Sequence, residues 1–241
     1  MTGELDRLRA YCAALAANNN RAWFHEHHDE YDRARADFAE LLEHLRFAVC
    51  RAAPALEADV MYARVKDWTY RIPRDARIPR DLPPYNPSFR AYISADRRSM
   101  LPIGYFIHID GKECFYGTGV WMPDTEKTNR IRDYITAHAA QLEELLDAAG
   151  VQLQGEKVKT MPRGYDRNCP GAEWVRHKNW MFFENLPERA LKSFAACARA
   201  VEEKTARFEP VRQFLLTAAT GEQSRSEQLE TYFSDRWGSE P

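Results

Sequence analysis

IGYFIHIDGKECFYGTGVW, residues 103–121, is the stretch that decides the fold. Two runs rich in β-branched and aromatic residues flank Asp110-Gly111-Lys112, which predicts an antiparallel hairpin with an Asp-Gly turn. If the turn consists of Asp110 and Gly111, His108 lies opposite Glu113 on one face of the hairpin. With a three-residue loop, the side chains of one strand would point to the opposite face, so the pairing of His108 with Glu113 depends on the length of the turn.

Helical periodicity surrounds the hairpin on both sides, with apolar residues recurring at steps of three and four. It predicts helices at 5–16, 21–53, 124–149, 173–178, 187–203 and 210–220. Alternating and β-rich runs predict further strands at 89–94 and 179–184, and one or two strands, broken by Lys66-Asp67, over 60–71. The pattern indicates an α+β fold, a mainly antiparallel sheet covered by several helices. We expect a single compact domain over residues 1–220 and a peripheral tail at 221–241.

Composition excludes several classes of protein. The chain has 34 Lys and Arg against 36 Asp and Glu, which argues against a protein built mainly to coat nucleic acid. Its five cysteines are widely spaced without a Cys-x-x-Cys pair, so neither a disulfide framework nor a zinc site is expected. No apolar stretch has the length of a membrane span or signal peptide, so we expect a soluble cytoplasmic protein without membrane association, metal or cofactor.

RIPRDARIPRDLPPY, residues 71–85, repeats the unit Arg-Ile-Pro-Arg-Asp almost unchanged. Pro73 and Pro79 restrict the backbone and favour an extended or polyproline II conformation. In the latter, every third residue lies on the same edge, and that edge would carry Arg71, Arg74, Arg77 and Arg80. A row of guanidinium groups is suited to phosphate or carboxylate oxygens.

The sequence therefore predicts a site for a small phosphorylated or carboxylated ligand. The candidate binding residues are the basic and hydroxyl side chains Arg71, Arg74, Arg77, Tyr85, Lys157, Lys159, Tyr165 and Lys178. His108 and Asp75 are the candidates for proton transfer, because an imidazole or a carboxylate beside an anion clamp can act as an acid or a base.

Two other interpretations stay open. The arginines could belong to a non-catalytic module that recognises nucleic acid or an acidic partner segment, although the overall charge does not favour nucleic acid. They could also pair with Asp75 and Asp81 in a scaffold without an anion site. An enclosed pocket would favour the enzyme, whereas a long basic groove would favour the polymer. No nucleophile or nucleotide-binding motif decides the question, and the oligomeric state is not predicted.

Several segments together resemble a known family. They are Asn18 to Phe24, Arg71-Ile72 with Arg74-Asp75 and Arg77, Asp81 with Pro84-Tyr85, Gly104-Tyr105 with His108, Gly117 to Pro123, Gly155 to Lys157, Pro162 with Gly164-Tyr165, and Lys178. In order and spacing they are similar to the family called domain of unknown function 2461, over roughly residues 5–216. The resemblance implies a compact α+β unit and no particular activity.

Overall fold

A computed structural model describes residues 3–74, 82–94 and 103–221. It confirms the predicted α+β class with an antiparallel sheet and several helices. The chain divides into two compact units: unit 1 comprises Met1–Thr118 and Phe183–Glu209, and unit 2 comprises Gly119–Phe182 and Pro210–Pro241. The predicted bounds of the domain and of the tail stay predictions, and residues 222–241 lie outside the described part.

Helices make up a large part of unit 1. Its helices are α1 (Asp6–Ala17), α2 (Arg21–Glu26), α3 (His28–Ala52), η1 (Pro54–Leu56), α4 (Glu57–Met61), α5 (Val65–Trp68), η2 (Glu188–Lys192) and the part of α9 (Phe194–Thr220) that precedes Pro210. Asn20 caps α2 by accepting the backbone N–H of Trp23 at 2.9 Å. The single helix expected over 21–53 is wrong, because His27 leaves the helical conformation at φ −104° and ψ 27° and separates α2 from α3.

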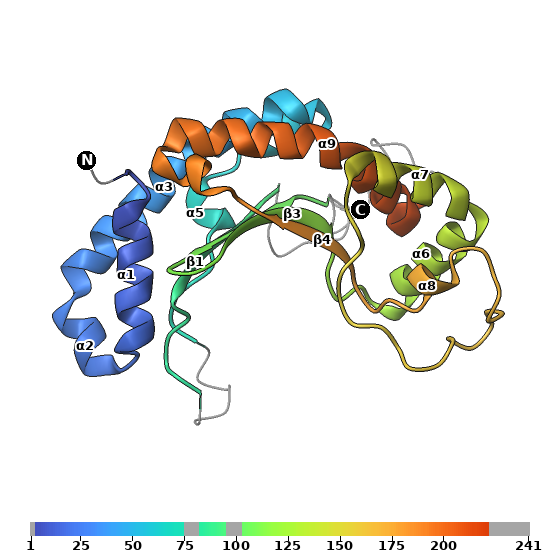
Figure 1. Cartoon of the computed structure of the whole chain (residues 1–241), viewed down its shortest axis with the longest axis horizontal. Helices are drawn as coiled ribbons and strands as arrows, with labels where there is room; N and C mark the ends of the chain where they lie inside the picture. The colour runs from blue at the N-terminus through green and yellow to red at the C-terminus, as the bar shows by residue number, and fades with distance from the viewer. Residues whose placement is uncertain (1–2, 75–81, 95–102, 222–241) are drawn as a thin grey trace, which may run out of the picture. The chain divides into compact units, whose positions relative to one another are not determined.

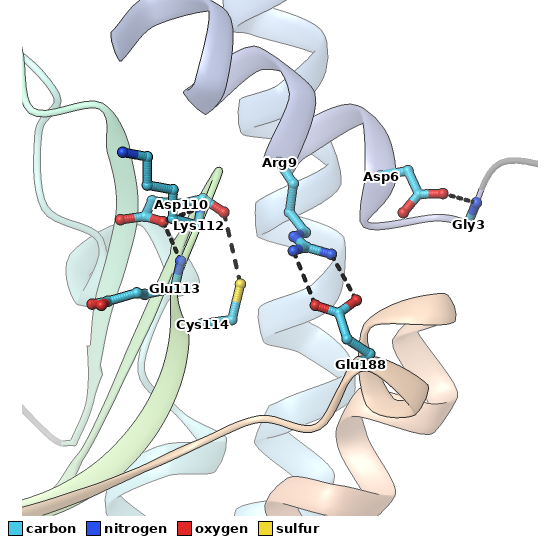
Figure 2. Close-up of polar contacts among 8 residues, drawn as sticks. All are labelled: Gly3, Asp6, Arg9, Asp110, Lys112, Glu113, Cys114 and Glu188. Carbon is cyan, nitrogen blue, oxygen red and sulfur yellow. Dashed lines mark hydrogen bonds and ion pairs between the residues drawn. The ribbon is translucent and has the colours of Figure 1, made fainter.

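The sheet has the order β1 (Ser88–Ile93), β2 (Tyr105–Asp110), β3 (Cys114–Val120), β4 (Trp180–Asn185). Figure 1 labels β1, β3 and β4. β1 pairs with β2, and β2 with β3, in antiparallel register. His108 lies opposite Phe115 rather than Glu113, so the conditional pairing of His108 with Glu113 is wrong. Figure 2 shows the reason: the Asp110 carboxylate accepts the backbone N–H groups of Lys112 and Glu113, both at 2.6 Å, and so precedes the turn.

One face of this sheet forms the core of unit 1. Tyr105, Ile107 and Ile109 of β2 are fully buried on it. Contacts from α1 and α3 cover this side, and α9 contributes Thr205, whose hydroxyl lies 2.7 Å from that of Tyr116. Because successive residues of a strand point to opposite faces, Phe106, His108 and Asp110 belong to the other face.

The strand expected at 60–71 is wrong over most of its length. The segment forms the single-turn helices α4 and α5, and Thr69 alone makes a bridge to Ala91 of β1. Glu57 and Asp59 occupy the first turn of α4, where negative charge favours a helix start. Trp68 at the end of α5 is fully buried, and its indole N–H donates to the carbonyl of Ser94 at 2.8 Å. Short apolar runs do not distinguish the two structures by periodicity alone.

Unit 2 contains α6 (Thr125–Ala137), α7 (Ala139–Ala149), α8 (Ala172–Val175) and the end of α9. Asp124 caps α6 by accepting the N–H of Lys127 at 2.8 Å, and Gly150 ends α7 in the left-handed conformation at φ 62°. The single helix expected over 124–149 is wrong, because His138 leaves the helical conformation at φ −125° and ψ 30° and separates α6 from α7. The predicted helices at 187–203 and 210–220 are wrong in their bounds, because Pro210 lies inside the continuous helix α9. Within the described ranges of both units, no helix is long and apolar enough to span a membrane.

Candidate functional site

The arginine-rich stretch forms the stem of a hairpin in unit 1. Pro73 pairs with Tyr85, the N–H of Arg74 donates to the carbonyl of Pro84 at 2.9 Å, and the N–H of Asn86 donates to that of Ile72 at 2.8 Å. Polyproline II has no such internal hydrogen bonds, so the described part of the segment adopts the extended alternative. Asp75, Arg77, Arg80 and Asp81 lie outside the described residues.

Asn19 holds this stem in place. Its side-chain amide donates to the carbonyl of Tyr85 at 3.0 Å and accepts the N–H of Tyr85 at 3.1 Å. The ring of Phe24 stacks on that of Tyr85, with 4.2 Å between the ring centroids. These contacts explain the run Asn18-Asn19-Asn20, in which Asn19 binds the stem and Asn20 caps α2. Through these contacts Tyr85 anchors the stem to Asn19 and Phe24.

Two arginines come together where the stem meets the sheet. Arg90 lies on β1, and its guanidinium is 5.6 Å from the ring centroid of Tyr70. Burial is the main cause that lowers the pKa of Arg90, and the positive charge of Arg74 lowers it further against an opposing effect of Tyr70. The Nε atoms of Arg74 and Arg90 are both buried and have no hydrogen-bond partner among the described residues. The positive charges of Arg74 and Arg90 thus lie close enough to affect each other, and each side chain has a buried Nε donor without a partner in the described part of the chain.

His108 lies on the strand beside Arg90. The register of β1 and β2 places the two residues directly opposite each other. Nε2 of His108 is 3.0 Å from Oδ2 of Asp110, and the imidazole stacks on Phe115 at 4.5 Å between centroids. Such a carboxylate fixes the orientation of the ring, and a proton on Nε2 leaves Nδ1 able to accept another.

Asp110 is suited to this role. Burial alone would raise its pKa, but the hydrogen bonds from His108, Glu113 and Lys112 together lower the pKa below its ordinary value. Because the lowered pKa belongs to the folded state, its contribution to stability is present above the unfolded pKa. It is lost as the pH falls through the folded one. The carboxylate is therefore ionised at neutral pH and supports the imidazole.

The remaining predicted side chains lie in unit 2. Lys178 binds Glu156 at 2.8 Å, Lys157 is 3.9 Å from Glu173, and Lys159 is exposed. The Tyr165 hydroxyl donates to Asp133 at 2.7 Å; burial, followed by this hydrogen bond, raises the pKa of Tyr165 to about 12. Their assignment as ligand-binding residues stays a prediction. Within unit 1, Arg71 is exposed on the same stem as Arg74.

Sequence analysis missed Arg90 and Asp110. The alternation of residues 89–93 contained the signal for Arg90, because it separates this side chain from the buried Phe89, Ala91 and Ile93. The Asp-Gly pattern predicts Asp110 as a turn residue, whereas it ends β2, and its second carboxylate oxygen binds His108. In the part of the chain that the structure describes, no group of three or more His, Cys, Asp or Glu side chains could hold a metal ion.

Comparison with known families agrees with the resemblance seen in the sequence. A family model described as Conserved hypothetical protein (DUF2461) matches residues 8–214 of the 241. The chain belongs to this family. Neither the curated proteins nor the solved structures compared with this DUF2461 chain gave a match. The description of the family names no activity.

Proposed function

We propose that this DUF2461 protein binds a small phosphorylated or carboxylated ligand at Arg74 and Arg90, beside His108. The observation that carries the proposal is the pair of buried Nε atoms without a hydrogen-bond partner among the described residues. A buried N–H donor without a partner costs free energy, and arginine keeps its charge in proteins. A phosphate or carboxylate between the two groups would accept the unused donors and offset their mutual repulsion.

The competing explanation is that Asp75 or Asp81 neutralises these arginines. Both carboxylates lie outside the described residues, and binding measurements distinguish the two explanations. Arg71, on the same stem as Arg74, and Arg77, three residues after Arg74 in the sequence, belong to the proposal as additional cationic groups. Their role is to strengthen the attraction of an anion to the site.

An enzymatic role would use the pair formed by His108 and Asp110. With Nε2 of His108 donating to Asp110, Nδ1 is the group that would accept a proton from a bound ligand. Asp75, which directly follows Arg74, is the other candidate for proton transfer. The anion clamp would hold the ligand so that this transfer takes place at a fixed position.

Replacing Arg90 by glutamine tests the anion site. We expect inorganic phosphate to raise the melting temperature of the unmodified protein, and Arg90→Gln to weaken phosphate binding about 10- to 100-fold, because a charged hydrogen bond contributes about 1.5–3 kcal/mol. Arg33→Gln is the matched control, since Arg33 is an exposed arginine on α3 of the same unit. Equal phosphate affinity in both variants and the unmodified chain would refute the proposal.

A second candidate function is recognition of an acidic partner segment. A groove of about 570 Å³ lies between η2 and α9 in unit 1. Lys204 and Arg207 in its wall bind Glu184, whereas Arg189 and Arg199 have no ion pair among the described residues. These two guanidinium groups are available to carboxylates of another chain.

A labelled hexa-aspartate peptide tests this groove. We expect the double variant Arg189→Gln/Arg199→Gln to weaken peptide binding roughly tenfold, with an affinity that also falls as salt is added. The control is Arg21→Gln/Arg33→Gln, which removes the same charge from exposed positions elsewhere in unit 1. An identical loss in both double variants would mean that net charge, rather than the groove, attracts the peptide.

We also propose that the protein resides in the cytoplasm. All five cysteines are free thiols in the structure, as expected for a reducing compartment.

A further inference from the structure

Three phenylalanines form a cluster on the sheet face that carries His108. Phe106 lies 6.0 Å from both Phe115 and Phe183, and Phe115 lies 5.3 Å from Phe183, measured between ring centroids. The three residues come from β2, β3 and β4, and each is partly exposed. All of them belong to unit 1.

The phenylalanine cluster is continuous with the charged residues of the proposed site. Tyr70 packs edge-on against Phe106 at 6.1 Å and lies beneath the guanidinium of Arg90 at 5.6 Å. On the other side, His108 stacks on Phe115 with only 5° between the ring planes. A molecule bound to Arg90 therefore lies next to an aromatic surface.

This arrangement is unusual for the second face of an antiparallel sheet. Such a face is commonly polar when water covers it. Here aromatic rings occupy neighbouring positions on adjacent strands, next to guanidinium donors without partners among the described residues. Gly117 stands opposite Phe106 and places no side chain on this face. The face combines an apolar surface with a cationic one, which matches a ligand that has both parts.

We propose that the ligand of this site is an aromatic anion, a planar ring that bears a phosphate or a carboxylate. The anionic group binds Arg74 and Arg90, and the ring packs on the cluster of Phe106, Phe115 and Phe183. Aromatic rings favour offset or edge-to-face contacts with one another beyond the area that they bury. This inference rests on the proposed function, because it adds a ring to the anion already proposed there.

Calorimetric titration of the full chain with matched ligands tests the inference. The probes are inorganic phosphate, cyclohexyl phosphate and phenyl phosphate, of which the last two have the same number of carbons and differ in aromaticity. We expect phenyl phosphate to bind roughly fivefold more tightly than cyclohexyl phosphate and more tightly still than inorganic phosphate. Benzoate and cyclohexanecarboxylate provide the same comparison for a carboxylated ligand, and the tighter aromatic probe identifies the anionic group.

A variant of the cluster separates the ring from the anion. Phe115→Leu keeps an apolar side chain and should remove most of the preference for phenyl phosphate over cyclohexyl phosphate. Phe47→Leu is the control, because Phe47 is an exposed phenylalanine of α3 in the same unit, and should leave the preference unchanged. Equal binding of the phenyl and cyclohexyl ligands would overturn this inference alone. Absence of binding by every probe would overturn it together with the proposed function.

Discussion

Replacing Gly104 by alanine is expected to destabilise the protein by about 3 kcal/mol or more. A Cβ atom at Gly104 would lie 2.6 Å from Cβ of Ser94 and closer still to the carbonyl oxygen of Ile93. Neither neighbour can move away freely. The N–H of Gly104 donates to the Tyr92 hydroxyl at 2.6 Å, and its carbonyl accepts the Thr118 hydroxyl at 2.7 Å. The added methyl group must therefore separate β1 from β2.

Urea unfolding followed by circular dichroism measures the effect. Gly164→Ala is the control: a Cβ there meets nothing within 4 Å, so only the backbone penalty at φ 95° remains, about 1 kcal/mol. We also expect Gly104→Ala to weaken phosphate binding in the fraction that still folds, since β1 and β2 bring Arg90 opposite His108. If Gly104→Ala is as stable as Gly164→Ala, the strands are less tightly packed at this point than the structure shows.

The elements that the sequence predicts correctly have signals within a few residues. The hairpin of β2 and β3 follows from two β-rich runs around a turn. The break between α6 and α7 at His138 is not predicted, but the start of α6 and the end of α7 follow from Asp124 and Gly150. Each of these residues acts on backbone groups near it in the chain. Such signals survive folding because no distant neighbour is needed to produce them.

The features that the sequence does not predict depend on distant neighbours. His108 pairs with Phe115, two residues beyond the predicted Glu113. The reason is that the Asp110 carboxylate binds His108 before the turn and the backbone N–H of Glu113 after it. The segment around Trp68 forms a helix rather than a strand, and the indole N–H of Trp68 donates to the carbonyl of Ser94, which lies 26 residues later in the chain. The number of arginines in the sequence likewise does not show which guanidinium groups have hydrogen-bond partners in the folded chain. Arg74 was predicted from a repeat, whereas Arg90 became a candidate only when its surroundings were known.

Arg46, in contrast to Arg90, is a buried arginine whose guanidinium has several hydrogen-bond partners. We expect Arg46→Ala to destabilise the protein by about 3–5 kcal/mol. The side chain of this α3 residue is only 8% exposed. Its guanidinium donates to Glu43 at 2.8 Å, to the carbonyls of Val60 and Met61, and to the carbonyl of Ala63 at 2.8 Å. The alanine variant removes all these donors at the end of α4 and leaves the carbonyls without them.

The variant Arg46→Met separates the contribution of packing from that of hydrogen bonding. Arg46→Met keeps an apolar stem against Trp68, whose ring lies 4.6 Å from the guanidinium, but provides no donor. We expect it to recover only a minor part of the loss, because the unsatisfied carbonyls cost more than the packing returns. Arg51→Ala is the control; Arg51 is 57% exposed in its ion pair with Glu202, so its removal should change stability little. Full stability of Arg46→Met in urea unfolding would show that water replaces the guanidinium at these carbonyls. It would also remove the contrast with Arg90, because a buried arginine would then be dispensable even where it has partners.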